Sequence, residues 1–395
     1  MADNKNDANK AQVRKKKQAS TAIEIAKAVV LLALFALFAL VILNNRDMLT
    51  AQNARVVLSY LDFSGANEDK LSDNQIRFFA NNQSRYATFK NQFCAISTDG
   101  LRIFQGYNAE ESFFSMASES PVLLSAQRFL LAYDYGKNFI NVFNSNGLVK
   151  NIIYDYPVQC ASLNDSGYFA VATGARGYKG NVLVYDRNMN TVFQWLISDG
   201  YVGDIALSPS NAELCGALVI PDGGKISTNL VLYKLDSENP FKTVSLQDTM
   251  IIDVAYKDPN LIAAVSPTAF FLYDGKGEQV QTYTYSGGYL WTYSLEARRY
   301  NVFCTAQNVL GENITVHVVD NTGAEVSRFS VAASVKDVEV NDQGIVLLTS
   351  SKLLHMDFEG QLLAEVDVFS DVREIVLSEN GAYLVSLGMA QYIRL

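Results

Sequence analysis

The sequence predicts an all-β protein, a β-propeller of about eight four-stranded blades preceded by one N-terminal transmembrane helix. Short apolar runs separated by turn signals continue from about residue 75 to the C-terminus, without a sustained helical stripe. The chain contains 21 Tyr and 22 Phe but only 7 Pro, which favours strands because aromatic rings fit a half-buried pleated surface. An uncharged apolar stretch near the N-terminus is the third observation, and it predicts the membrane helix.

The first two segments are a basic tail and an apolar span. Residues 1–22 are polar and rich in lysine, so we expect a solvated tail there. From Ala28 to Leu43 no side chain is charged or polar. With Ile23 and Ile25 the span covers residues 23–43, which is enough to cross a hydrocarbon layer of about 30 Å. Because lipid offers no hydrogen-bond partners to an open backbone, we expect this span to be helical.

The flanks of the span predict its orientation. Lysine and arginine crowd the N-terminal side, whereas only Arg46 follows the span closely, beside Asp47. The positive-inside rule therefore predicts a single-pass cell-membrane protein with its N-terminus in the cytoplasm and its C-terminal domain outside. A cleaved signal peptide is the alternative, for which the sequence LTA at 49–51 is the best cleavage site.

Residues 44–74 are predicted to be a linker between the span and the propeller. Within this linker, TAQNARVVLSYL has the composition of a short amphipathic helix, and SGANEDKLSDN is polar. The extracytoplasmic propeller is expected over residues 75–395.

Two classes of turn recur along the rest of the chain, with a period of about forty residues. In the first class, Asp or Asn opens a turn between two apolar strands and Gly or Asn stands near its end, as in the turns that begin at Asp274 and Asp320. The second class contains Gly167, Gly344 and Gly381 at the same phase of their repeats. Four short strands in each such repeat are typical of a propeller, in which every blade buries its faces against its neighbours.

This period divides the chain into seven complete blades and one incomplete blade. The complete blades are expected near residues 86–117, 121–156, 158–198, 201–246, 250–286, 289–331 and 334–368. Three strands then remain, and a sheet with an open edge invites aggregation. We therefore expect residues 75–81 to supply the fourth strand and close the ring. Seven blades is the rival arrangement, because the first blade is the least regular.

The charge of the chain limits the kinds of partner that it can bind, and the positions of its cysteines indicate whether disulfides form. The formal net charge is −9 at pH 7, and because the N-terminal tail is basic, the domain beyond it is more acidic than this total. Such a body is not expected to bind nucleic acid. The cysteines lie in four separate apolar runs, which favours free buried thiols over disulfides. They are Cys94, Cys160, Cys215 and Cys304.

The sequence contains no motif that carries catalysis. His317 and His355 lie in strand-like segments without metal-ligand spacing, so we expect structural roles for both. A nucleophile elbow, a phosphate-binding loop and a paired-cysteine site are all absent from the sequence. We therefore expect neither a metal nor a cofactor.

One hairpin, NVLVYDRNMNTVFQWLI at 181–197, resembles the repeat of pyrroloquinoline-quinone-type propellers. An apolar strand, an Asp-led turn and a strand with Trp near its end carry the match, at Val184, Tyr185, Asp186, Thr191 and Trp195. Asn190 stands where that repeat has glycine. Only 2 Trp occur in the chain, so the ring of docked tryptophans that such blades build is missing, which argues against the quinone cofactor. WD-type propellers are a looser match.

The layout of the whole chain resembles a family of membrane-anchored propeller proteins of Gram-positive bacteria. The matching features are the tail KNDANKAQVRKKK, the apolar span, and blade sequences such as NQFCAISTDGLRIF and NGLVKNIIYD. This resemblance implies the bacterial cell membrane as the location. It brings no assigned activity and no functional residues.

A ligand is expected at one rim of the ring, where the connections from each outer strand to the next inner strand gather on a rigid scaffold. These connections carry the candidate ligand-binding residues Asp155, Tyr156, Asp199, Tyr201, Asp248, Tyr289, Phe369 and Asp371. Carboxylates beside exposed aromatic rings suit a basic peptide, a polyamine or the face of a sugar. The competing interpretation is that Asp is simply a good turn former at these positions.

The sequence therefore predicts a non-catalytic binding or scaffolding protein. It would be tethered to the cytoplasmic membrane through residues 23–43 and would display the propeller rim to an envelope protein, a peptide or a polysaccharide. The alternative is a propeller enzyme, either a quinone-dependent oxidoreductase or a glycan-acting hydrolase or lyase that uses rim carboxylates.

Overall fold

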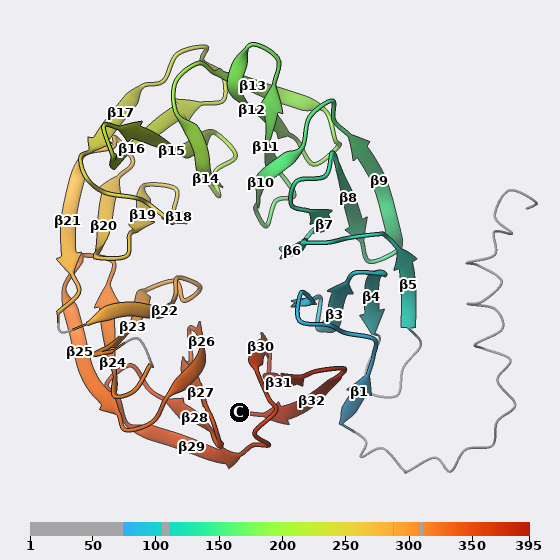
Figure 1. Ribbon diagram of the computed structural model, residues 1–395, viewed down its shortest axis with the longest axis vertical. Helices are drawn as coiled ribbons and strands as arrows, with labels where there is room; N and C mark the ends of the chain where they lie inside the picture. The colour runs from blue at the N-terminus through green and yellow to red at the C-terminus, as the bar shows by residue number, and fades with distance from the viewer. Residues whose placement is uncertain (1–73, 105–110, 287, 309–310) are drawn as a thin grey trace, which may run out of the picture. The chain divides into compact units, whose positions relative to one another are not determined.

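The computed structural model describes residues 74–104, 111–286, 288–308 and 311–395. These residues form eight four-stranded antiparallel sheets around a central opening, which is the predicted β-propeller (Figure 1). The predicted tail and membrane span, and the linker as far as residue 73, lie outside the described residues. Within the described part of the chain, no helix is long and apolar enough to cross a membrane.

Seven blades each take four strands from one continuous segment, with the first strand innermost and the fourth outermost (Figure 1). Blades 1 and 2 contain β2 (Arg85–Phe89), β3 (Gln92–Ser97), β4 (Gly100–Phe104), β5 (Glu111–Ser115), β6 (Pro121–Ser125), β7 (Leu130–Asp134), β8 (Phe139–Asn144) and β9 (Gly147–Ile153). Blades 3 and 4 contain β10 (Val158–Leu163), β11 (Phe169–Ala175), β12 (Tyr178–Tyr185), β13 (Thr191–Ile197), β14 (Tyr201–Leu207), β15 (Glu213–Asp222), β16 (Lys225–Lys234) and β17 (Lys242–Leu246).

The next three blades follow the same order. They contain β18 (Asp253–Asp258), β19 (Leu261–Val265), β20 (Ala269–Asp274) and β21 (Gln279–Thr284) in blade 5, β22 (Tyr289–Ser294), β23 (Tyr300–Ala306), β24 (Ile314–Asp320) and β25 (Glu325–Val331) in blade 6, and β26 (Val335–Asn341), β27 (Gly344–Thr349), β28 (Lys352–Met356) and β29 (Leu362–Asp367) in blade 7. The innermost strands of most neighbouring blades contact one another, and together the innermost strands surround the central opening.

Blade 8 joins the two ends of the propeller. Its strands β30 (Glu374–Ser378), β31 (Gly381–Ser386) and β32 (Met389–Arg394) come from the C-terminus, and β1 (Gln75–Arg77) is its outer strand. β1 pairs with β32 in antiparallel register, with Ile76 opposite Ala390. The Asn74 side chain extends this pairing by donating to the Tyr392 carbonyl at 3.0 Å. The prediction that a segment within 75–81 closes the ring is confirmed, and the ring has eight blades rather than seven.

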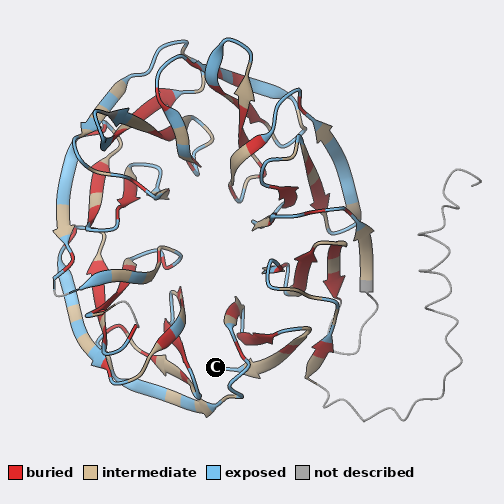
Figure 2. Ribbon diagram, viewed as in Figure 1, coloured by how far each residue is buried: buried red, intermediate tan, exposed pale blue. Residues whose placement is uncertain are grey.

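The hydrophobic core is divided among the boundaries between blades. The buried apolar residues form eight clusters, and each cluster joins two adjacent blades. Figure 2 shows the same division, with buried residues on the middle strands and exposed residues along the outer strands. The stability of each blade therefore depends on its two neighbours.

Trp195 of the hairpin that resembles quinone-type propellers belongs to one of these clusters. Its ring lies 4.9 Å, between centroids, from that of Tyr233 in the next blade. Gly216 of β15 provides the space, because a Cβ atom there would lie 2.6 Å from the Trp195 ring. The role of this tryptophan is therefore packing between blades 3 and 4.

The Asp-led turns connect the third and fourth strands, and they have the predicted hydrogen bonds. Asp274 accepts two backbone N–H groups at 2.9 Å each, and Gly277 adopts a φ of 75°. Asp186 accepts two at 2.8 Å each in blade 3. The prediction that placed Asn190 at the glycine position is wrong by one residue, because Met189 adopts the positive φ, of 66°.

All four cysteines are free, as predicted. Cys94, Cys215 and Cys304 are buried in second strands of their blades, and Cys160 is half-buried on an innermost strand. Burial raises the pKa of the first three thiols to about 12. These thiols are therefore poor nucleophiles and poor metal ligands.

Ring closure through β1 should be essential to stability. Ile76 is buried in the cluster that joins blades 8 and 1, so we expect Ile76→Ala to lower the free energy of unfolding by about 2–4 kcal/mol. Urea unfolding followed by tyrosine fluorescence measures the change. Ile153→Ala on β9 is the matched control, since that side chain is exposed and its loss should cost less than about 0.5 kcal/mol. Equal effects of the two substitutions would contradict the proposed importance of closure.

Candidate functional site

The eight residues predicted from the sequence lie on one face of the propeller, which we call the rim. Each follows an outer strand or begins the next inner strand, and in an antiparallel four-stranded blade these two points lie at the same end. All eight are exposed, and the four aromatic side chains retain between 36% and 68% of their accessible surface. The rim therefore presents large apolar surfaces to solvent.

The rim residues are held individually rather than as one cluster. Lys179 of the neighbouring blade donates to the Tyr201 hydroxyl at 3.2 Å and lies 5.0 Å from the centre of its ring. Lys225 forms an ion pair with Asp248. No hydrogen bond or ion pair of the described residues joins any two of the eight. The sequence did not indicate that lysines already contact two of them.

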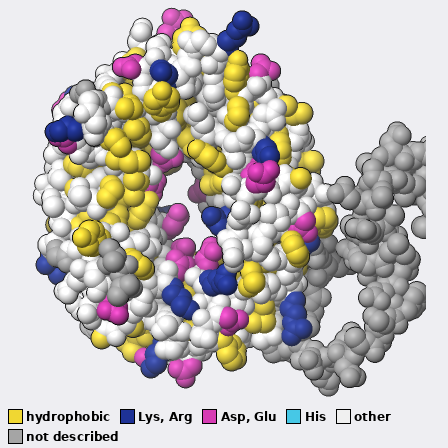
Figure 3. All heavy atoms as spheres, viewed as in Figure 1, with side chains coloured by type: hydrophobic (Ala, Val, Ile, Leu, Met, Phe, Trp, Pro, Cys, Tyr) yellow, Lys and Arg dark blue, Asp and Glu magenta, His cyan; other side chains and the backbone are white. Residues whose placement is uncertain are grey.

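Three more aromatic residues extend the rim. Tyr135 and Tyr178 flank the connections between second and third strands in blades 2 and 3, and Trp291 lies on β22 beside Tyr289. The Trp291 indole N–H donates to the carbonyl of Val335 at 2.8 Å, so the ring is fixed although it is exposed. Figure 3 shows hydrophobic side chains gathered beside the opening.

A second group of acidic residues, which the sequence analysis did not single out, lines the central channel. We call this group the channel carboxylates, and its members are Asp204, Asp253, Glu296, Asp337, Glu339 and Glu374. They come from innermost strands, or from the residues directly after one, in the consecutive blades 4 to 8. Figure 3 shows acidic side chains around the opening. Closure of the ring therefore brings together negative charges that are far apart in sequence.

Two of the channel carboxylates, Asp204 and Asp253, influence each other's ionisation. Burial raises the pKa of both carboxyls. Burial, together with the charge of Asp253, raises the pKa of Asp204 to about 7. Asp204 also accepts the backbone N–H of Val254 at 2.9 Å, so it connects blades 4 and 5.

Asp337 repeats this connection between blades 7 and 8. Its two oxygens accept the N–H groups of Val338 and Ile375 at 2.9 and 2.8 Å. Asp204 and Asp337 each directly follow a β-bulge of the innermost strand. Since a bulge redirects a side chain, the repeated irregularity explains why both aspartates point across to the next blade.

The remaining three channel carboxylates have no hydrogen-bond partner among the described residues. Glu339 lies on the innermost strand β26 and is half-buried. Burial, and then the charges of Asp337, Glu296 and Glu374, raise its pKa well above the ordinary value. Glu296 is open to solvent, although nearby protein atoms still raise its pKa. Burial raises the pKa of Glu374 to about 7.

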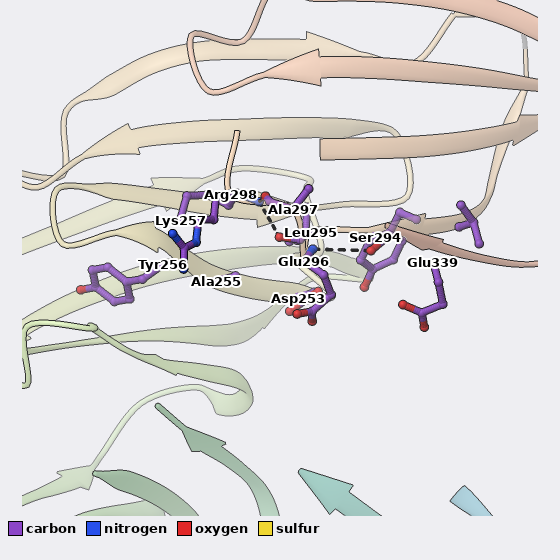
Figure 4. A pocket seen from close by; sticks show the side chains of 12 residues that line it. Asp253, Ala255, Tyr256, Lys257, Ser294, Leu295, Glu296, Ala297, Arg298 and Glu339 are labelled. Carbon is purple, nitrogen blue, oxygen red and sulfur yellow. Dashed lines mark hydrogen bonds between the residues drawn. The ribbon is translucent and has the colours of Figure 1, made fainter. Parts of the chain in front are cut away.

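Glu339, Glu296 and Asp253 line a cavity of about 430 Å³ (Figure 4). The Lys257 ammonium also lies at this cavity, but it donates to the carbonyls of Leu295, Ala297 and Tyr300 in the next blade. Burial lowers the pKa of Lys257 to about 8. The lysine thus fastens blade 5 to blade 6 and leaves the carboxylates of the cavity without a direct ion pair.

Three other cationic side chains near the opening also donate hydrogen bonds to neutral oxygen atoms. Lys336 donates to the carbonyls of Ser370 and Val372 at 2.9 and 2.8 Å. Arg373 donates to the side-chain oxygen of Asn82 at 2.7 Å, and Arg85 donates to the carbonyl of Ser84 at 3.0 Å. Among the described residues, no ion pair within 4.0 Å involves a channel carboxylate. Arg298, which lines the cavity together with Lys257, pairs with Asp342 at 3.6 Å.

The arrangement also limits the chemistry of the site. In the described ranges, no three acidic, histidine or cysteine side chains lie close enough to hold a metal ion. Burial raises the pKa of both carboxyls in the Asp204–Asp253 pair.

The sequence did contain a signal for the channel carboxylates. An acidic residue precedes Ile or Val near the start of four innermost strands, in the segments VGDI, IIDV, VKDV and VREI.

A hydroxyl–imidazole–carboxylate triad occurs elsewhere in blade 6, and it is inaccessible. The two ring nitrogens of His317 lie 2.9 Å from the Thr305 hydroxyl and 3.0 Å from Glu325. Both Thr305 and His317 are fully buried, so no substrate reaches the hydroxyl. Burial also lowers the pKa of His317, and the predicted structural role of this histidine is confirmed.

The fold defines the class of protein as a β-propeller, and solved propeller structures are similar to it. The C-terminal WD40 domain of Sif2 has a TM-score of 0.57 and 11% identity over 82% of this chain and 96% of that chain. BamB from Moraxella catarrhalis has a TM-score of 0.51 and 12% identity, over 81% of this chain and 98% of that chain. The dihydro-heme d1 dehydrogenase NirN has a TM-score of 0.54 and 14% identity, over 74% of this chain and 67% of that chain. At these identities the likeness shows the fold alone.

The family is defined more closely by sequence. Residues 68–395 match the model of a family of unknown function, DUF5711, and the chain belongs to this family. No curated protein matches the chain. The residues of the site therefore have to be interpreted from their own geometry.

The raised pKa of Asp204 predicts an unusual dependence of stability on pH. The pKa of Asp204 is about 7 in the folded protein and about 4 in an unfolded chain, so the folded state holds the proton more tightly. The contribution of this group to the free energy of unfolding should therefore fall as the pH rises from about 4 to about 7. Asp204→Asn should flatten the urea midpoint between about pH 5 and 8. Asp155→Asn, an exposed loop substitution, is the control and should keep the wild-type slope. An unchanged slope in Asp204→Asn would contradict the assignment.

Proposed function

We propose that the chain is a non-catalytic binding or scaffolding protein of a Gram-positive bacterium, tethered to the cytoplasmic membrane by residues 23–43. The propeller would be displayed outside the cell, where its rim binds an envelope protein or peptide. The uncharged span and its basic N-terminal flank support this topology. The rim aspartates then face partners that arrive from the envelope.

The observation that carries the proposal is the set of exposed aromatic side chains on the rim. Tyr201, Tyr289 and Phe369 retain 48%, 64% and 68% of their accessible surface, although a soluble protein gains nothing by exposing them. They lie at strand ends of rigid blades, so little conformational entropy is lost when a partner orders them. Aromatic residues of this kind commonly act as anchors in protein interfaces.

The chemistry of the rim supports binding over catalysis. The aspartates at 155, 199, 248 and 371 belong to separate blades, and no described hydrogen bond joins one to another or to a histidine. The triad-like arrangement of Thr305 and His317 has no access to solvent. A surface with anchors and separated charges is suited to recognition, since recognition needs no convergent acid, base or nucleophile.

Replacing the aromatic anchors should abolish capture of the partner. In full-length protein crosslinked in intact membranes, we expect Tyr201→Ala, Tyr289→Ala and Phe369→Ala together to reduce partner recovery at least about tenfold, because one such anchor contributes roughly 2 kcal/mol. Asp155→Asn, Asp199→Asn, Asp248→Asn and Asp371→Asn together form a second variant, which tests the charges. Quantitative mass spectrometry of the crosslinked partners measures recovery.

The matched control removes apolar surface from a different place. Ile153, Leu362 and Leu363 are exposed on the outer strands, so their replacement by alanine removes comparable area from the circumference of the ring. This variant should recover the same partners as the wild type. If the rim and circumference variants both recover the wild-type partners, the rim is not the binding surface.

A further inference from the structure

We propose that β13 pairs with β13 of a second copy of this chain, so that two propellers form a symmetric dimer through their edges. The contact lies on the circumference of the ring, at the outermost strand of blade 3. It involves neither the rim nor the channel, and so it goes beyond the function proposed above.

The outer edge of β13 is not protected against pairing with another strand. Among the described residues β13 pairs only with β12, so alternate N–H and C=O groups of its backbone point away from the sheet. Exposed strand edges are usually protected by charged residues or by proline. Neither kind of residue occurs in β13 or in β21, which is rich in glutamine and threonine. The other outer strands all contain a charged residue, and they are β1, β5, β9, β17, β25 and β29.

One face of β13 adds apolar surface to this edge. Val192 and Leu196 retain 41% and 42% of their accessible surface, and Gln194 between them is exposed on the same face. On the opposite face, Phe193 and Trp195 are buried against blade 4. Because this packing already fixes the strand, pairing with a second copy loses little conformational entropy. The pairing would also cover apolar side chains that are otherwise left in solvent.

The sequence of β13 selects a second copy of the same strand as its partner. In an antiparallel pair with two-fold symmetry, the central residue of the strand lies opposite its own copy. Three outer strands have 7 residues each, and their central residues are Lys150 in β9, Gln194 in β13 and Arg328 in β25. Self-pairing of β9 or β25 would place like charges opposite each other, which is destabilising. In β13 two neutral amides meet instead, and Val192 lies opposite Leu196 of the second copy.

The direction of the outer strands decides how the two rings lie in this dimer. Outer strands such as β9, β21 and β29 follow the circumference of the ring (Figure 1), and β13 has the same position in blade 3. When two rings lie side by side with their rims facing the same way, the outer strands that meet run in opposite directions. Antiparallel pairing of β13 therefore keeps both rims on one side, as two chains tethered to one membrane would require.

Sedimentation velocity of the full-length protein in detergent tests this proposal. We expect a reversible dimer, and Gln194→Lys should raise its dissociation constant about tenfold or more, because two ammonium groups would then lie opposite each other. A high salt concentration should restore part of the lost affinity, since it screens this repulsion. At a dilution at which both proteins are monomers, their thermal midpoints should agree, because residue 194 is exposed.

A cysteine crosslink locates the contact independently. In the dimer, residue 194 lies opposite its own copy with the Cβ atoms about 4.5–5.5 Å apart. Gln194→Cys should therefore form a disulfide between two copies under mild oxidation. The wild type, whose four cysteines are free, controls for crosslinking through those thiols and should remain uncrosslinked under the same conditions.

The matched control is Gln281→Lys, which adds the same charge at an exposed position of β21, the other uncharged outer strand. It should dimerise as the wild type does. A monomeric wild type would overturn the proposal. Equal dissociation constants of Gln194→Lys and the wild type would also overturn it, because the two copies would then meet elsewhere. Failure here is distinguishable from failure of the rim proposal, since the rim variants leave β13 unchanged.

Discussion

The packing of each blade against its two neighbours is the interaction on which the rest of the structure depends. A single four-stranded sheet cannot bury both of its faces, and here the buried apolar residues lie in clusters that each join two blades. A chain of blades arranged in this way would leave two unprotected faces at its ends. The pairing of β1 with β32 removes both ends, because it fixes blade 8 to the segment that leads into blade 1.

Closure has an electrostatic consequence as well as a hydrophobic one. The innermost strands converge on one axis, and in blades 4 to 8 they carry acidic residues near their ends. Two of these residues contribute to the fold, because Asp204 and Asp337 bond backbone N–H groups of the following blade. Glu339 makes no such bond, and burial raises its pKa.

The rim and the channel differ in the physics of recognition that they offer. On the rim, the aromatic rings of residues such as Tyr289 and Phe369 are exposed and present apolar area to solvent. Little charge has to be neutralised when a partner covers these rings. In the channel, the carboxyls lie in a narrow space bounded by protein, where charge interactions are screened less than at the surface. A macromolecular partner suits the rim. The propeller provides both the rim and the channel, because the strand ends form its two faces while the innermost strands surround its central opening.

The sequence by itself determined the repeat and the closing strand, and it left seven blades as a rival to eight until the structure showed eight. These follow from local chemistry, since Asp-led turns bond their own backbone and an unpaired strand edge needs a partner. It also located exposed residues on the outer-to-inner connections, although it did not reveal that Lys179 and Lys225 contact two of them. Only the tertiary structure revealed which acidic residues line the channel. Asp253 and Glu339 occupy ordinary strand positions, and only their convergence across blades places them at one cavity. The physical reason is that interactions between charges depend on distance in space, which a strand pattern does not specify until the ring is closed.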